Sequence, residues 1–129
     1  MTIQAIISYG EFLDKLTILE IKNERIADTD KLKNIQNELS SVKQLWQDCP
    51  ASKIDISAEL TALKAVNEKL WEIEDAIRDN ERQQNFDQSF IDLARSVYFE
   101  NDDRANIKRD INLKLGSDFV EEKSYEEYQ

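Results

Sequence analysis

Hydrophobic residues recur along most of the chain at alternating three- and four-residue spacing, which is the period of amphipathic α-helices. Ser8 and Glu11 stand at the spacing of a capping box, which predicts that a first helix begins near Gly10. Pro50 ends a second helix, because proline has no backbone N–H to donate and restricts the residue before it. The first three helices are predicted over about residues 10–26, 31–48 and 57–82.

A fourth helical segment follows a break at residues 83–86. Asp87 is a suitable N-cap and Gly116 a suitable C-terminal cap. The polar run at residues 101–103 leaves two alternatives open, one continuous helix or two shorter ones. The pattern therefore predicts an all-α helical bundle of four to five helices. We expect one domain over residues 1–116 and an acidic, aromatic tail over residues 117–129.

Two of the predicted helices carry heptad seams, which favour packing of one helix against another. Leu39 and Val42 belong to the seam of the second helix, and Leu63 and Leu70 to that of the third. Because the connection between these helices is short, we expect them to form the antiparallel helix hairpin around which the bundle is built. Their remaining apolar faces predict a homo-oligomer.

Polar side chains interrupt the apolar arcs of three predicted helices. At 100° per residue, these charged and amide groups fall between or beside the hydrophobic positions. They add up to two acids and three bases, with one tryptophan, Trp71, beside them. The polar residues are Glu20 and Asn23 in the first helix, Asn67, Glu74 and Arg78 in the third, and Asn101, Arg104 and Lys108 in the fourth.

This polar stripe has two interpretations, and the pattern leaves both open. In the first, it is a buried ion network in which Glu74 is the partner of Arg104 or Lys108, because buried charges cost several kcal/mol unless they are paired. In the second, it is a ligand site whose surplus positive charge holds an anion such as a phosphate ester. The candidate ligand-binding residues are Glu20, Asn67, Trp71, Glu74, Arg78, Asn101, Arg104 and Lys108.

The amino-acid composition limits the reactions and the partners that can be expected of this chain. The chain has no histidine, which removes the usual general base near neutral pH and every histidine-based zinc site. Its single cysteine, Cys49, forms no internal disulfide and is expected to pack as a small apolar residue, so a cytoplasmic location is predicted. The net charge of −10 argues against nucleic-acid binding. No apolar run approaches the roughly 20 residues that span a bilayer, so no membrane association is expected.

One acidic step resembles a metal-binding pattern. Glu72 and Asp75 have the Glu-x-x-Asp form found in all-α nucleotide pyrophosphohydrolases, whose facing helices hold magnesium. The paired acids that should stand shortly before this step are missing, so we assign no metal ligand and no cofactor. The likeness is an analogy of fold alone.

Four segments have the length and specificity of family motifs. They are residues 10–22 (GEFLDKLTILEIK), 67–78 (NEKLWEIEDAIR), 94–104 (ARSVYFENDDR) and 120–125 (VEEKSY). Together they resemble a family of small bacterial and phage proteins whose domain has no established function. The resemblance implies no activity and no catalytic residue. Some members are encoded near genes for cell-surface polysaccharides, which favours sugar or nucleotide-sugar ligands.

These observations predict a non-enzymatic binding or regulatory module with a polar, charged core or pocket. Its expected partners are further copies of itself and either an anionic small molecule or a partner protein. The alternative function is a metal-dependent hydrolase that acts on a nucleotide or nucleotide-sugar phosphate.

Overall fold

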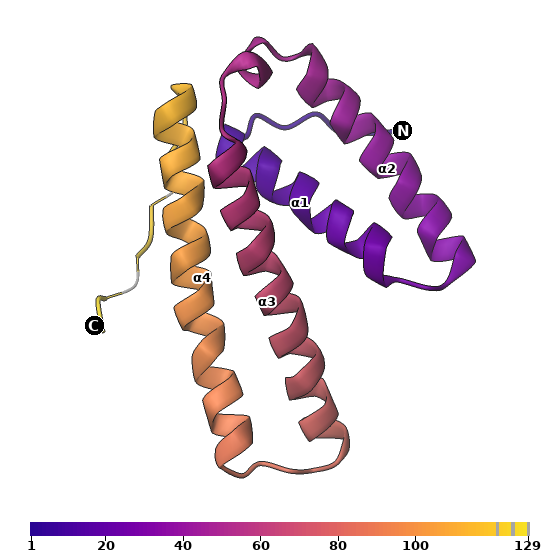
Figure 1. The fold of residues 1–129 in the computed structure, drawn as a ribbon, viewed down its shortest axis with the longest axis vertical. Helices are drawn as coiled ribbons and strands as arrows, with labels where there is room; N and C mark the ends of the chain where they lie inside the picture. Colours follow the sequence, from indigo (N-terminus) through magenta and orange to yellow (C-terminus); the bar gives the residue numbers. More distant parts are fainter. Residues whose placement is uncertain (121, 125, 129) are drawn as a thin grey trace.

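The computed structural model describes residues 1–120, 122–124 and 126–128. Within these residues the chain forms four α-helices, one short 3-10 helix and no strand, which confirms the predicted all-α bundle (Figure 1). The elements are α1 (Tyr9–Arg25), α2 (Thr29–Asp48), η1 (Pro50–Lys53), α3 (Ser57–Arg82) and α4 (Gln88–Leu115).

The helix ends lie close to their predicted positions because local chemistry determines them. Ser8 accepts a hydrogen bond from the backbone N–H of Glu11 at 3.1 Å at the start of α1. α2 and α4 are each capped by the side chain of an aspartate of their own. Gly116 ends α4 with a φ of 68°, the left-handed conformation that glycine adopts without strain. Of the two alternatives for the fourth segment, the continuous helix is correct, since α4 passes through residues 101–103 without a break.

The central helix is α1, which packs against α2, α3 and α4 (Figure 1). The antiparallel hairpin consists of α3 and α4, and the predicted hairpin of the second and third helices is wrong. The apolar seams of those two helices meet α1 instead of each other, because α1 is apolar on more than one side. Leu39 and Val42 of α2 and Leu63 of α3 are buried in one core with Leu13 and Leu16 of α1.

The start of α1 is fixed to the end of α4. The first amides of a helix have no partner inside it. In α1, the N–H of Gly10 donates to Asn112 Oδ1 at 2.6 Å, and the N–H of Tyr9 donates to Ser117 Oγ at 3.4 Å. A Cβ atom on residue 10 would lie 2.6 Å from the carbonyl oxygen of Lys108. Glycine is therefore required where these two helices cross.

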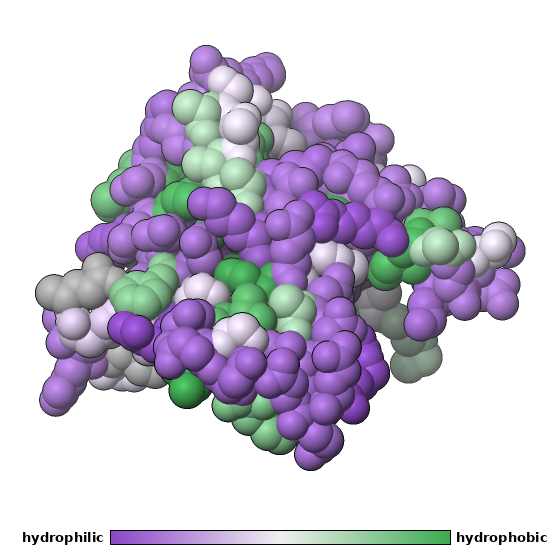
Figure 2. Space-filling model, turned by 60° about the horizontal axis from the view of Figure 1, so that its bottom comes forward, coloured by the Kyte–Doolittle hydropathy of each residue, from purple (hydrophilic) through white to green (hydrophobic). Residues whose placement is uncertain are grey.

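The outer half of the α3/α4 hairpin extends beyond α1 (Figure 1). All of residues 68–110 are described, and none of them is buried. The face turned forward in Figure 2 shows hydrophobic side chains exposed among hydrophilic ones. The core of the molecule therefore lies at the base of the hairpin, around α1.

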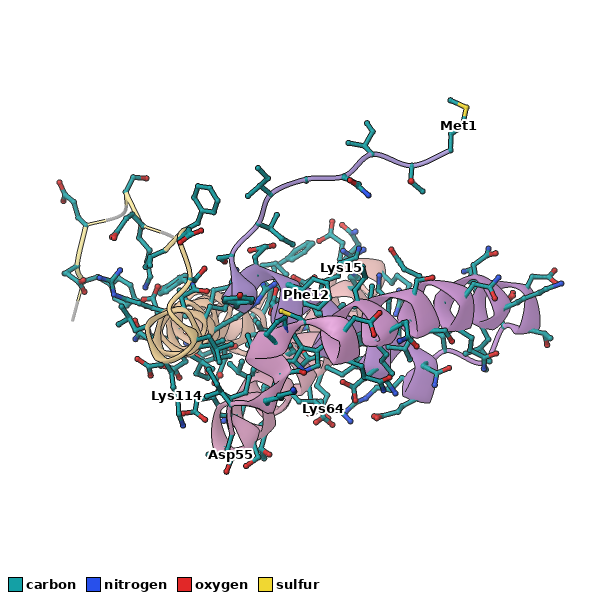
Figure 3. The ribbon with its side chains drawn as sticks, turned by 90° about the horizontal axis from the view of Figure 1, so that it is seen from above. Met1, Phe12, Lys15, Asp55, Lys64 and Lys114 are labelled. Carbon is teal, nitrogen blue, oxygen red and sulfur yellow. The ribbon has the colours of Figure 1, made fainter. Side chains whose placement is uncertain are left out.

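The two terminal segments take different courses. Residues 1–7 leave the bundle as an extended segment that ends at Met1, away from the helices (Figure 3). The C-terminal segment returns along α4, where Lys123 Nζ lies 3.0 Å from Asp102 Oδ1 and the Tyr128 ring lies 5.3 Å from that of Tyr98. The sequence also predicts that Tyr125 packs against the bundle or a neighbouring subunit, but this residue lies outside the described ones.

Candidate functional site

A buried carboxylate, Asp14, joins α1 to α3 and α4. Its side chain is only 3% exposed. Arg104 of α4 binds both carboxylate oxygens, with Nε 2.9 Å from Oδ1 and Nη2 bonded to Oδ2. These hydrogen bonds raise the pKa of Arg104, so its guanidinium remains charged. Such pairing is necessary, because an ion in the interior loses several kcal/mol of hydration.

Asn67 of α3 completes this network. It is 5% exposed, and its Nδ2 donates to Asp14 Oδ1 and to Thr17 Oγ1, at 2.9 Å in both cases. Thr17 in turn donates to the backbone carbonyl of Asp14 at 2.8 Å. The network therefore links three helices through one acid, one base and two neutral polar groups, and this agrees with the structural interpretation of the polar stripe.

A second ion pair connects α1 with α4. Lys108 Nζ lies 2.6 Å from Glu11 Oε2, and the lysine side chain is 14% exposed. The bases of α4 that line the stripe therefore pair with acids of α1. The prediction that Glu74 pairs with Arg104 or Lys108 is wrong, since Glu74 is exposed and pairs with Arg78 of its own helix at 3.4 Å.

The error at Glu74 has a geometric cause. Residues 67 and 74 lie on the same face of α3, but seven residues advance a helix by about 10 Å. α1 covers this face of α3 at Asn67 and leaves it exposed at Glu74 and Arg78. Asn101 of α4 is exposed as well. Periodicity indicates which face of a helix turns inward. It does not indicate how far a neighbouring helix extends along that face.

Sequence reasoning also missed Asp14, although a signal for it was present. Gly10, Asp14, Thr17 and Ile21 are spaced four, three and four residues apart, and all four are buried. Two small residues at helical spacing permit close approach of another helix. A polar residue within a stripe of small residues is therefore as strong a candidate for burial as a polar residue within a stripe of leucines.

A cleft lies beside the buried network, between α1, α3 and α4. Its volume is about 360 Å³, at the lower end of the range usual for small-molecule pockets. Five of the candidate site residues line it: Asn67, Trp71, Glu74, Asn101 and Arg104. The remaining lining residues are Ile18, Ile21, Leu70 and Asp75. Of the other candidates, Glu20, Arg78 and Lys108 do not line the cleft.

Several polar groups around the cleft lack a partner among the described residues. Asp75 and the indole N–H of Trp71 form no hydrogen bond with any of them, although a partly buried tryptophan usually finds an acceptor. The side-chain oxygen of Asn67 likewise accepts none, because only its Nδ2 is used in the network. The cleft therefore combines an apolar floor with free donors and acceptors, which is the usual composition of a ligand site.

The electrostatics of the cleft differ from the prediction. Arg104 is neutralised by Asp14, and the acids Glu74 and Asp75 both line the cleft. The surplus of positive charge that favoured an anionic ligand is therefore absent. The error arose because the two acids of α1 that pair with Arg104 and Lys108 were not counted.

The Glu-x-x-Asp step forms no metal centre in the part of the chain that the structure describes. Glu72 pairs with Arg25 at 3.2 Å, whereas Asp75 faces the cleft. No group of three or more acidic or cysteine side chains suited to a metal ion occurs among the described residues. The hydrolase alternative thus receives no support from this step.

Among the described residues, no helix combines the length and apolarity that crossing a membrane requires. No curated protein and no solved structure matches the chain. A family model matches residues 3–128, nearly the whole chain, and its description is "Family of unknown function (DUF6165)". The resemblance found in the sequence motifs is thereby confirmed, and the chain belongs to this family of unknown function, DUF6165.

Proposed function

We propose that this protein is a non-enzymatic binding module whose ligand site is the cleft between α1, α3 and α4. The ligand we infer is a cationic group with an apolar stem, as a lysine or arginine side chain of a partner protein would supply. One observation carries the proposal. Trp71, Asp75 and Asn67 line one cleft, and each has a polar group with no partner among the described residues.

The chemistry of the lining supports a cation. The face of a tryptophan ring attracts ammonium and guanidinium groups, by about 0.5–2 kcal/mol depending on desolvation. The carboxylates of Glu74 and Asp75 lie on the same helix as Trp71 and line the same cleft. Ile18 and Leu70 offer apolar contact to the methylene stem of a basic side chain.

An anion fits this cleft less well. Arg104 is the only base among the lining residues. Its Nε and Nη2 are bonded to the carboxylate of Asp14, and its Nη1 donates to Asn101 Oδ1 at 3.5 Å. An incoming phosphate or carboxylate would compete with Asp14 for Arg104 and would meet Glu74 and Asp75 at the same time. The charge arrangement therefore favours a basic partner over the anionic small molecule that the sequence pattern suggested.

Nuclear magnetic resonance tests the proposal directly, because the chain has only two tryptophans. The indole N–H signal of Trp71 reports on the cleft, and that of Trp46 on α2 serves as an internal control. N-acetyl-arginine amide is expected to shift the Trp71 signal in a saturable way and to leave Trp46 unchanged. Its neutral analogue, N-acetyl-citrulline amide, and inorganic phosphate should have much smaller effects.

Two matched variants sharpen the test. Asp75→Asn removes a cleft carboxylate and should weaken the response to N-acetyl-arginine amide several-fold. Asp79→Asn removes a carboxylate one turn farther along α3, outside the cleft, and should leave the response intact. The proposal is wrong if phosphate shifts Trp71 and the arginine amide does not, or if the two variants respond alike.

A further inference from the structure

The free hydrogen-bond acceptors of the cleft lie on both sides of Trp71. Asn67, Trp71 and Asp75 follow one another at four-residue spacing along α3, so they are successive neighbours on one face of that helix. The side-chain oxygen of Asn67 and the carboxylate of Asp75 accept no hydrogen bond from any described residue. A ligand that lies against the indole therefore has one acceptor towards the base of the hairpin and another towards its outer half.

The acceptor nearer the base belongs to a buried side chain. Asn67 is only 5% exposed, and its Nδ2 donates to both Asp14 and Thr17. Because the amide group is planar, these two bonds also fix the direction of its oxygen. A buried side-chain acceptor without a hydrogen bond costs free energy, and a ligand that donates to it removes this cost.

Asp75 supplies a full negative charge on the other side of the indole. Its carboxylate forms no ion pair with any described residue, whereas Glu74 Oε2 lies 3.4 Å from Arg78 Nε. Of the two carboxylates that line the cleft, that of Asp75 is thus the one with both oxygens free. Two parallel hydrogen bonds to one carboxylate are the binding mode that a guanidinium group favours.

The two basic side chains differ in where their donors lie. A lysine ammonium carries three N–H groups on a single nitrogen, whereas an arginine guanidinium carries five around the edge of a flat group. A flat group can stack on an indole while one edge donates to Asp75 and another to Asn67. An ammonium directs all its donors from one point, so it suits two acceptors on opposite sides of a ring less well.

Given the binding role proposed above for the cleft, we infer that the cleft selects arginine over lysine. The guanidinium of a partner's arginine lies against Trp71, two of its N–H groups donate to Asp75, and a third donates to Asn67 Oδ1. Asp75 therefore determines the specificity. Glu74 adds negative charge that attracts both bases without distinguishing between them.

Nuclear magnetic resonance titrations of the full chain with three monovalent cations test the inference. Judged by the shift of the Trp71 indole N–H signal, N-acetyl-arginine amide should bind about tenfold more tightly than N-acetyl-lysine amide. Symmetric dimethylation of the arginine amide keeps its charge but blocks bidentate hydrogen bonding, so the dimethylated form should bind several-fold more weakly than the unmodified one.

The results separate this inference from the proposed function. If the arginine and lysine amides bind equally, or the dimethylated form binds as tightly as the unmodified one, selection of arginine is wrong while binding of a cation in the cleft stands. If none of the three shifts the Trp71 signal, the proposed function is wrong as well.

Variants of two adjacent acids separate specificity from charge. Asp75→Asn should bring the affinities for the arginine and lysine amides to within about twofold of each other, because the guanidinium loses its carboxylate partner. Glu74→Gln removes an equal charge from the same cleft, and should weaken the binding of both amides while keeping their ratio. Both residues are exposed, and circular dichroism checks that each variant retains its helical content. A ratio that is unchanged in Asp75→Asn, or that falls equally in the two variants, overturns the role of Asp75.

Discussion

At the scale of single residues, the structure depends on a few polar groups inside a helical core. Asp14 receives hydrogen bonds from Arg104 and Asn67, and therefore connects α1 to both helices of the hairpin. Buried polar networks stabilise a fold when every member has a partner, and they destabilise it when one member is removed. A substitution should thus lower the free energy of unfolding much more in this network than in the exposed part of the same polar stripe.

We expect Arg104→Gln to lower the free energy of unfolding by about 3–5 kcal/mol, because it leaves Asp14 buried without a counter-charge. Glu74→Gln should change it by less than about 0.5 kcal/mol, since Glu74 and its partner Arg78 are both exposed. Urea denaturation of the two variants measures both values. Equal losses would show that Glu74 belongs to the buried network after all.

Gly10→Ala gives a second prediction at this scale. Alanine is the better helix former by about 1 kcal/mol. Its Cβ, however, would lie 2.6 Å from a backbone carbonyl oxygen of α4 and 2.9 Å from Asn112 Oδ1. We expect a net loss of about 1–3 kcal/mol, as for other overpacked sites. Ser40→Ala on the exposed side of α2 is the control, and a Gly10→Ala protein as stable as that control would contradict the close crossing of α1 and α4.

The sequence indicated some of these residues and not others. Asn67, Arg104 and Lys108 were identified because each interrupts a clear apolar arc, and all three prove to be buried or partly buried. Their partners Asp14 and Glu11 were not identified, because ion pairs between helices depend on packing that periodicity does not contain. Asn67 and Trp71 both line the cleft, because residues four apart are neighbours on one helix face.

At the scale of the elements, helix ends were predictable and helix pairing was not. Caps such as Ser8 and Gly116 act within a few residues, so their effect can be inferred from local sequence. The heptad seam of α2 is equally clear in the sequence, yet a seam does not specify which helix covers it. Here Leu13 and Leu16 of α1 share one core with that seam, and the predicted hairpin of the second and third helices does not form.

The C-terminal segment gives the prediction at this scale. Hydrogen bonds from Tyr128 and Lys123 lower the pKa of Asp102 below its ordinary value of 3.8, so this contact is present above pH 3.8 and is lost as the pH falls through the lowered value. Burial, together with the bond to Asp102, raises the pKa of Tyr128 from 10 to about 12. The contribution of this hydrogen bond to docking of the segment is complete below pH 10 and is lost as the pH rises towards 12.

The segment should therefore leave α4 at both pH extremes. The nuclear Overhauser effect between the rings of Tyr128 and Tyr98 measures its docking. Asp102→Asn should remove the acidic transition, and Tyr128→Phe the alkaline one. A ring contact in the wild type that weakens neither as the pH is lowered nor as it is raised would show that these groups do not hold the segment.

At the scale of the whole molecule, stability is unevenly distributed. The core surrounds α1, whereas residues 68–110 include no buried side chain. Parts of a protein with few buried apolar contacts open locally without global unfolding. We expect backbone amides at residues 76–99 to exchange with deuterium at least tenfold faster than those in the middle of α1.

Hydrogen exchange followed by mass spectrometry measures this difference. Uniform exchange throughout the four helices would show instead that the chain opens only as a single cooperative unit.

The contact between the start of α1 and the end of α4 also determines when the protein can fold during its synthesis. The first amides of α1 bind Asn112 and Ser117, which follow in the chain more than 100 residues later. During synthesis, which proceeds from the N-terminus, α1 therefore lacks its buried counter-charge until Arg104 has been made, and it lacks these caps until Ser117 has been made. Because α1 is the centre of the core, we infer that the nascent chain assembles its tertiary structure only after translation has passed residue 117.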